Sequence, residues 1–173
     1  MSSVEQLKYK DDVDRRYGVA GMVLAAFILD YEKYISSVSI ERSGLEAIEF
    51  SPDFFIVSGE NISAKTSWEH ILEQYQVIAS MMISNMMCRS MVGSRRELDR
   101  AMHDAMMSTL KDYAEDCQLE KDEAEAIFDK HYQYLNRAYH NSNLHVAAKR
   151  LVEELTSKPV LYHSDLCDLV RSL

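Results

Sequence analysis

The most informative stretch of the sequence runs from Thr66 to Cys117: TSWEHILEQYQVIASMMISNMMCRSMVGSRRELDRAMHDAMMSTLKDYAEDC. It contains two N-terminal capping boxes, Thr66-Ser67-Trp68-Glu69 and Ser94-Arg95-Arg96-Glu97, and Gly93 lies directly before the second. In such a box the hydroxyl and the Glu side chain bond free N–H groups at a helix start, whereas glycine commonly ends a helix. A stop and a start this close predict an antiparallel helical hairpin with a very short turn.

The chain before this hairpin divides into two parts. In residues 1–44 apolar side chains recur at three- and four-residue steps, which predicts a long or broken N-terminal helix from about Val4 to Ile40. Residues 45–65 form an insert and loop, because β-branched and aromatic residues surround the turn signal Ser51-Pro52-Asp53. We expect a small β-hairpin or an irregular apolar arm near residues 45–58.

The chain after the hairpin predicts further helices. Apolar stripes cover residues 124–138, with His131 as a core histidine, and residues 144–157, and Ser164 can cap a last short helix. We therefore predict one all-α domain over residues 1–173, a bundle of five to seven helices with residues 66–173 as its main body.

Composition excludes several classes of function. The formal net charge of −9 disfavours a nucleic-acid or anionic membrane partner. The longest apolar run near the N-terminus, Val19 to Leu29, is too short to span a bilayer. Cys88, Cys117 and Cys167 are odd in number and widely spaced, without a CxxC motif. This usage is typical of reduced thiols, so we predict a cytoplasmic protein.

Methionine is the most unusual feature of the composition, with ten residues. Most of them fall in the central hairpin, where methionine suits an irregular core or an adaptable binding surface. We predict an interaction surface for a second copy or one protein partner, and a Met-lined pocket for a small apolar molecule or a soft metal is an alternative. The predicted surface consists of Met82, Met86, Met87, Met91, Met102, Met106, Phe54 and Phe55.

The pair His103-Asp104 gives one hint of an enzyme. Together with His70 upstream and Asp129 downstream it resembles the metal-binding pattern of HD-type phosphohydrolases, which are all-helical. That resemblance implies a divalent metal held by these four residues and a metal-activated water. The Gly-Lys that often follows the pair in that family is absent here.

A second chemical hypothesis concerns the C-terminal end, where His163, Asp165 and Cys167 alternate. They share one side if the stretch is extended, although Ser164 favours a helix, and a Cys–His nucleophilic pair is an alternative there. Because convergent polar chemistry is otherwise sparse, our leading prediction is a non-enzymatic interaction protein without a cofactor. It forms a homodimer or binds one protein partner; an HD-type phosphohydrolase and a carrier of an apolar molecule are the alternatives.

Overall fold

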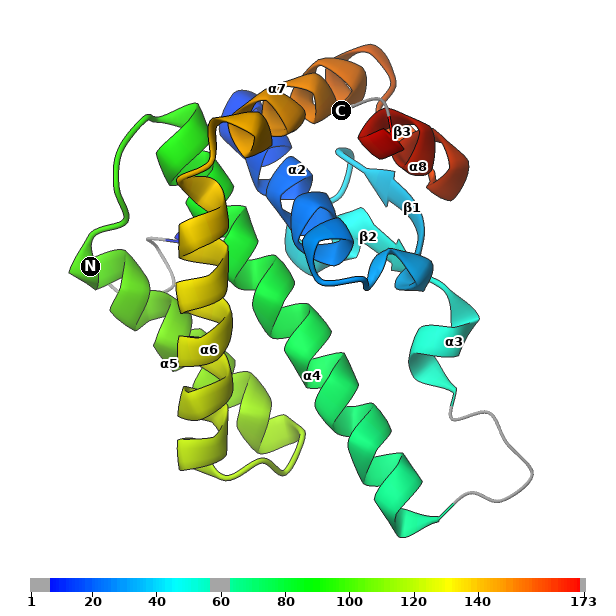
Figure 1. Ribbon diagram of the computed structural model, residues 1–173, viewed down its shortest axis with the longest axis vertical. Helices are drawn as coiled ribbons and strands as arrows, with labels where there is room; N and C mark the ends of the chain where they lie inside the picture. The colour runs from blue at the N-terminus through cyan, green and yellow to red at the C-terminus, as the bar shows by residue number, and fades with distance from the viewer. Residues whose placement is uncertain (1–6, 57–62, 172–173) are drawn as a thin grey trace.

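The computed structural model describes residues 7–56 and 63–171 (Figure 1). Helices dominate this part of the chain, so the predicted all-α bundle with a short insert is confirmed. Its seven α-helices are α2 (Asp12–Ile28), α3 (Pro52–Phe55), α4 (Ala64–Met87), α5 (Arg100–Asp116), α6 (Lys121–Tyr139), α7 (Ser142–Ser157) and α8 (His163–Arg171). Shorter helical turns are η1 (Glu32–Tyr34), η2 (Gly44–Ala47) and the π-helical η3 (Cys88–Gly93).

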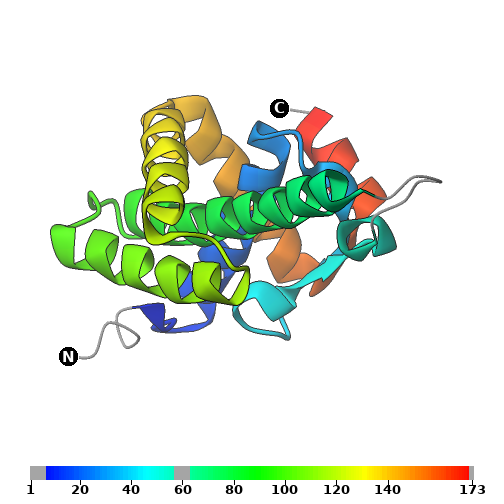
Figure 2. The ribbon, with the colours of Figure 1, turned by 90° about the horizontal axis from the view of Figure 1, so that it is seen from below.

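The predicted hairpin is formed by α4 and α5, which run in opposite directions side by side (Figure 2). Its boundaries differ from the prediction. Helix α4 begins one turn earlier, because the Ser63 hydroxyl accepts from the Thr66 amide at 3.1 Å. The prediction of a very short turn after Gly93 was wrong. The Ser94 amide donates to the Arg89 carbonyl oxygen and closes the π-helical turn, and α5 begins only after its cap residue Asp99.

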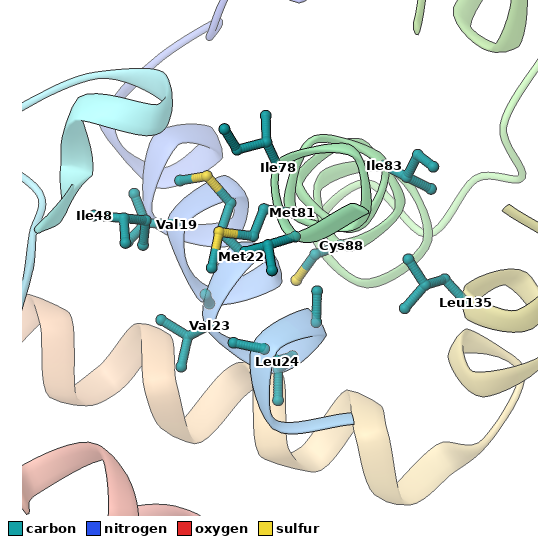
Figure 3. Close-up of a cluster of buried hydrophobic side chains, with 14 of the residues drawn as sticks. Val19, Met22, Val23, Leu24, Ile48, Ile78, Met81, Ile83, Cys88 and Leu135 are labelled. Carbon is teal, nitrogen blue, oxygen red and sulfur yellow. The ribbon is translucent and has the colours of Figure 1, made fainter. Parts of the chain in front are cut away.

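Helix α4 is the central element of the bundle. Helix α2 packs along one side of it and α6 along another, and α7 crosses α2 (Figure 1). Met22 of α2 and Met81 of α4 lie in the space between these two helices (Figure 3). Apolar side chains from all three of α2, α4 and α6 meet in one buried cluster, which explains why α4 carries apolar residues on more than one face.

The crossing of α2 and α4 depends on Gly21. A Cβ atom at this position would lie 2.4 Å from the Ser84 carbonyl oxygen and 2.7 Å from the Cys88 Cβ. The Ser84 hydroxyl donates to the Gly21 carbonyl oxygen at 2.6 Å and lies 2.7 Å from the Tyr139 hydroxyl. Gly21 therefore marks a close helix crossing, and a buried hydrogen-bond chain ties α2, α4 and α6 together.

A small antiparallel sheet replaces part of the predicted N-terminal helix. Its strands are β1 (Ile35–Ser39), β2 (Ile48–Phe50) and β3 (Val160–Tyr162), in the order β2-β1-β3. In β1, Val38 pairs with Ile48 of β2 and with Leu161 of β3. The predicted helix up to Ile40 was wrong, because α2 ends at Ile28 and Asp30 then adopts a left-handed φ of 58°.

The insert is organised by this sheet. Residues 48–50 pair with β1 and not with a second strand inside the insert, so the predicted hairpin within residues 45–58 does not form in the described residues 45–56. Pro52 begins the short helix α3, as proline suits a first helical position. Residues 57 and 58 of the predicted insert lie outside the described residues.

The later helices follow the predicted stripes. Glu120 and Glu123 form the capping box of α6, and Asn141 caps α7. His131 is a buried core histidine whose Nδ1–H donates to the Ile127 carbonyl oxygen at 2.9 Å. Burial lowers its pKa below the ordinary 6.5, against the opposing effect of that hydrogen bond. Of the helices described, none has both the length and the apolar composition needed to cross a membrane.

Candidate functional site

The methionines of the hairpin divide into two groups. Met86, Met87, Met91 and Met106 are buried, with 3%, 0%, 7% and 1% of their surface exposed. Met82 and Met102 are half-buried, so they reach the surface. Only part of the predicted methionine surface is therefore accessible, and Met87 and Met91 contribute packing instead.

Met102 lines a separate cavity beside Asp14 and Arg89, whereas Met82 opens onto an apolar cavity of about 260 Å³. It lies between α2, α4, α5, the turn η2 and the first described residues of the chain. We call it the methionine groove. It is lined by Leu7, Tyr9, Met22, Gly44, Leu45, Met82, Asn85, Met86 and Met106. Three of the predicted site residues thus line one cavity: Met82 is half-buried, and Met86 and Met106 are buried.

One wall of the groove is a short segment that precedes α2. We call residues 7–10 the N-terminal strap. Arg89 of η3 holds it in place: its Nη1 donates to the Leu7 carbonyl oxygen at 2.9 Å, and its Nη2 donates to the Lys8 carbonyl oxygen at 2.7 Å. The Arg89 Nη1 also lies 3.0 Å from the Met86 sulfur, so the same guanidinium contacts both the strap and the groove.

Arg89 is buried and its charge is balanced. Its Nε and Nη2 donate to the two carboxylate oxygens of Asp14 at 3.0 and 2.6 Å, and only 5% of the Arg89 side chain is exposed. Burial by itself raises the pKa of Asp14. The hydrogen bonds from Arg89 and from the Lys10 amide, with the charge of Arg89, outweigh it and hold that pKa below the ordinary 3.8. This two-pronged, charge-assisted interaction joins η3 to α2 and fixes the guanidinium that holds the strap.

Tyr9 packs the strap against the bundle. Its ring lies under the Arg89 guanidinium, 4.6 Å from ring centre to carbon, and its hydroxyl accepts from the Asn85 side-chain amide at 2.8 Å. A Cβ at Gly18 would lie 2.6 Å from the Tyr9 ring and 2.8 Å from that amide nitrogen. Glycine at position 18 of α2 therefore allows Tyr9 to lie flat against the helix.

Sequence reasoning missed the residues that hold the strap. Arg89 lies 75 residues from Asp14 in the chain and still further from Tyr9, and no local pattern relates it to either. One signal was present, since Arg89 is the single charged residue in the otherwise uncharged stretch from Val77 to Val92. A buried arginine requires a partner, so its position alone indicated a buried ion pair.

The two residues of the predicted phenylalanine arm, Phe54 and Phe55, differ in burial. Phe54 is buried and stacks on Phe50 with 4.1 Å between ring centres. Phe55 is 64% exposed, and Ile56 beside it is 59% exposed. The arm is thus anchored by Phe54 and presents Phe55 and Ile56 to solvent.

The four residues of the HD hypothesis do not form one site. The His103 Nδ1 lies 3.1 Å from its neighbour Asp104, and the His103 ring packs edge-on against Phe128 and Tyr132 of α6. His70 lines a separate surface cavity on α4, and Asp129 is exposed. Across residues 7–56 and 63–171 no group of three or more His, Cys, Asp or Glu side chains could hold a metal ion. The local packing of His103 explains its place on the helix without a metal.

Comparison with known proteins adds no further identification. No family model, no curated protein and no solved structure matches this chain.

Proposed function

We propose that this chain is a non-enzymatic cytoplasmic protein that binds one protein partner through the methionine groove. The observation that carries the proposal is the convergence of Met22, Met82, Met86 and Met106 on one apolar cavity. Methionine is unbranched and polarizable, so a surface rich in it adapts to the side chains of a partner.

An amphipathic helix is the partner that fits this surface best. Such helices place apolar side chains at three- and four-residue steps into a hydrophobic groove. A cavity of about 260 Å³ accepts one or two large apolar side chains as an anchor. The net charge of −9 favours a partner whose polar face is basic, because complementary charge speeds association. A second copy of this chain carries the same charge of −9 and lacks this complementarity, so it is the less favoured partner.

Two variants at half-buried methionines test the groove. Met82→Lys places a charge in the groove, whereas Met107→Lys places it on a half-buried methionine outside the groove lining. We expect a basic amphipathic model peptide to bind the wild type and Met107→Lys, and to bind Met82→Lys at least about tenfold more weakly, as expected for a charge that must be desolvated. Equal binding by all three proteins would overturn the proposal, and circular dichroism of each variant checks that the helical fold is retained.

A small apolar molecule is a second candidate occupant. Its support is the size and lining of the groove, which approaches the roughly 300–1,000 Å³ of small-molecule sites. Native mass spectrometry of the purified chain separates the candidates. An added mass that disappears in Met82→Lys supports a bound small molecule, whereas a dimer that disappears in Met82→Lys supports self-association through the groove. A dimer unchanged in Met82→Lys places the contact between copies elsewhere.

A further inference from the structure

The C-terminal helix α8 brings a thiol and an imidazole into contact. The Cys167 sulfur lies 3.3 Å from the Nε2 of His163, one helical turn earlier. The sequence suggested this pair only for an extended chain, but a helix also places residues four apart on the same face. His163 is exposed and Cys167 is half-buried, so the contact is open to small molecules in solution.

A backbone carbonyl fixes the tautomer of this histidine. The His163 Nδ1 lies 3.0 Å from the carbonyl oxygen of Ile35, the first residue of β1. A carbonyl oxygen only accepts, so Nδ1 carries the hydrogen, and the Nε2 of the neutral ring has a free lone pair. That lone pair faces the Cys167 thiol, and the thiol S–H is the donor in the contact.

The other two cysteines lack such an arrangement. Cys88 is fully buried, and burial raises its pKa to about 12. Cys117 is half-buried like Cys167, but burial raises its pKa, and its hydrogen-bond partner is the Tyr113 hydroxyl. Among residues 7–56 and 63–171, Cys167 is thus the thiol that contacts an imidazole, and a thiolate is the form that reacts.

We propose that Cys167 is a site of reversible oxidation by peroxides, with His163 as the acceptor of its proton. The imidazole Nε2 takes the thiol proton, and the thiolate sulfur attacks one oxygen of hydrogen peroxide. The O–O bond breaks as the S–O bond forms, and the leaving hydroxide takes the proton from the imidazolium to give water. The sulfur is oxidised by two electrons to a sulfenic acid, and the peroxide is reduced. An added thiol reverses the change in two steps: one molecule condenses with the sulfenic acid to a mixed disulfide and water, and a second restores the Cys167 thiol as a disulfide of the added thiol leaves.

The experiment compares the three thiols within one molecule. The full chain is treated with less than one equivalent of hydrogen peroxide and dimedone, and adducts at Cys88, Cys117 and Cys167 are quantified by peptide mass spectrometry. We expect Cys167 to be labelled at least about tenfold faster than Cys117. This factor is smaller than the rate enhancement of about 10²–10⁴ that general acid–base catalysis gives in enzymes, because this pair is open to water. His163→Gln should reduce labelling at Cys167 to the rate of Cys117 and leave Cys117 unchanged.

Two outcomes overturn the proposal. Labelling of Cys167 no faster than Cys117 shows that the thiol contact confers no reactivity. Unchanged labelling of Cys167 in His163→Gln shows that exposure alone, without proton transfer, sets the rate. The Cys117 rate also serves as a check on the fold, because unfolding would raise labelling at Cys88 and Cys117 together.

Discussion

Replacing Arg89 by methionine tests how the N-terminal strap is held. The substitution keeps a long, unbranched side chain but removes the charge and every N–H donor. Asp14 then loses both of its bonds to the guanidinium, and the carbonyl groups of Leu7 and Lys8 lose their donors. The variant therefore detaches the strap and leaves a carboxylate with little access to water.

The expected cost follows from the burial of the pair. Removing one partner of a buried ion pair typically costs about 3–5 kcal/mol. Because 11% of the Asp14 side chain is exposed, that carboxylate regains some water once the strap moves, so we expect a loss near the lower end, about 3 kcal/mol at pH 7. For a domain of this size such a loss lowers the Tm by about 6–12 °C.

The stability lost in Arg89→Met should depend on pH, because it depends on the charge of Asp14. The pKa of Asp14 is lowered in the folded protein, so its contribution to stability is present above the ordinary pKa of 3.8 and is lost as the pH falls through the lower, folded value. The difference between wild type and Arg89→Met should therefore be smaller at pH 3 than at pH 7. Urea unfolding followed by circular dichroism at both pH values measures this difference.

A double-mutant cycle supplies the refuting result. In Arg89→Met/Asp14→Asn neither charge remains, so the double variant should be at least about 1 kcal/mol more stable than the sum of the single effects indicates. Additive single effects, or a loss below about 1 kcal/mol for Arg89→Met alone at pH 7, would refute the conclusion that this buried ion pair stabilises the fold and fixes the guanidinium that holds the strap.

Three further substitutions test the packing of the helices and the strap. Gly21→Ala forces α2 from α4 and weakens the bond from Ser84, so we expect a loss of about 2–4 kcal/mol in thermal unfolding; unchanged stability contradicts the close crossing. The unfolded chain takes up a proton at His131 near pH 6.5, whereas the folded chain does so only at a lower pH, so this residue makes the free energy of unfolding fall from pH 7 to pH 5. His131→Gln should reduce that fall, as measured by urea unfolding at the two pH values. An equal fall in the wild type and the variant contradicts this prediction. Gly18→Ala should displace Tyr9 from the groove, and unchanged binding of the model peptide would show that the strap does not shape the site.

Local patterns predicted the helices but not the sheet. The stripes of α6 and α7 have a single interpretation, because their apolar residues alternate with charged ones over several turns. Ile35 and Val38 are three residues apart, which a helix and an irregular strand both allow. These residues form a strand because Val38 pairs with a neighbouring strand on each side. One of its partners, Leu161, lies near the other end of the chain, so no local pattern indicates this pairing.

The candidate site, like the fold, was predicted from the sequence only in part. Its methionines were identified because their density in the hairpin is visible in the sequence, but their division between core and surface depends on how α2 and α6 pack on α4. The strap escaped prediction because the contact of Arg89 with Asp14 joins residues far apart in the chain. Likewise, the contact of His163 with Ile35 exists only because β1 lies beside α8.

The position of β1 in the middle of the sheet has a consequence for biosynthesis. Its partner β2 follows closely in the chain, but β3 leaves the ribosome only after every helix from α3 to α7 has been made. Until then one edge of β1 carries unpaired backbone groups, and an exposed strand edge promotes aggregation. Nascent chains stalled or truncated before Val160 should therefore be the form of this protein that most needs a chaperone.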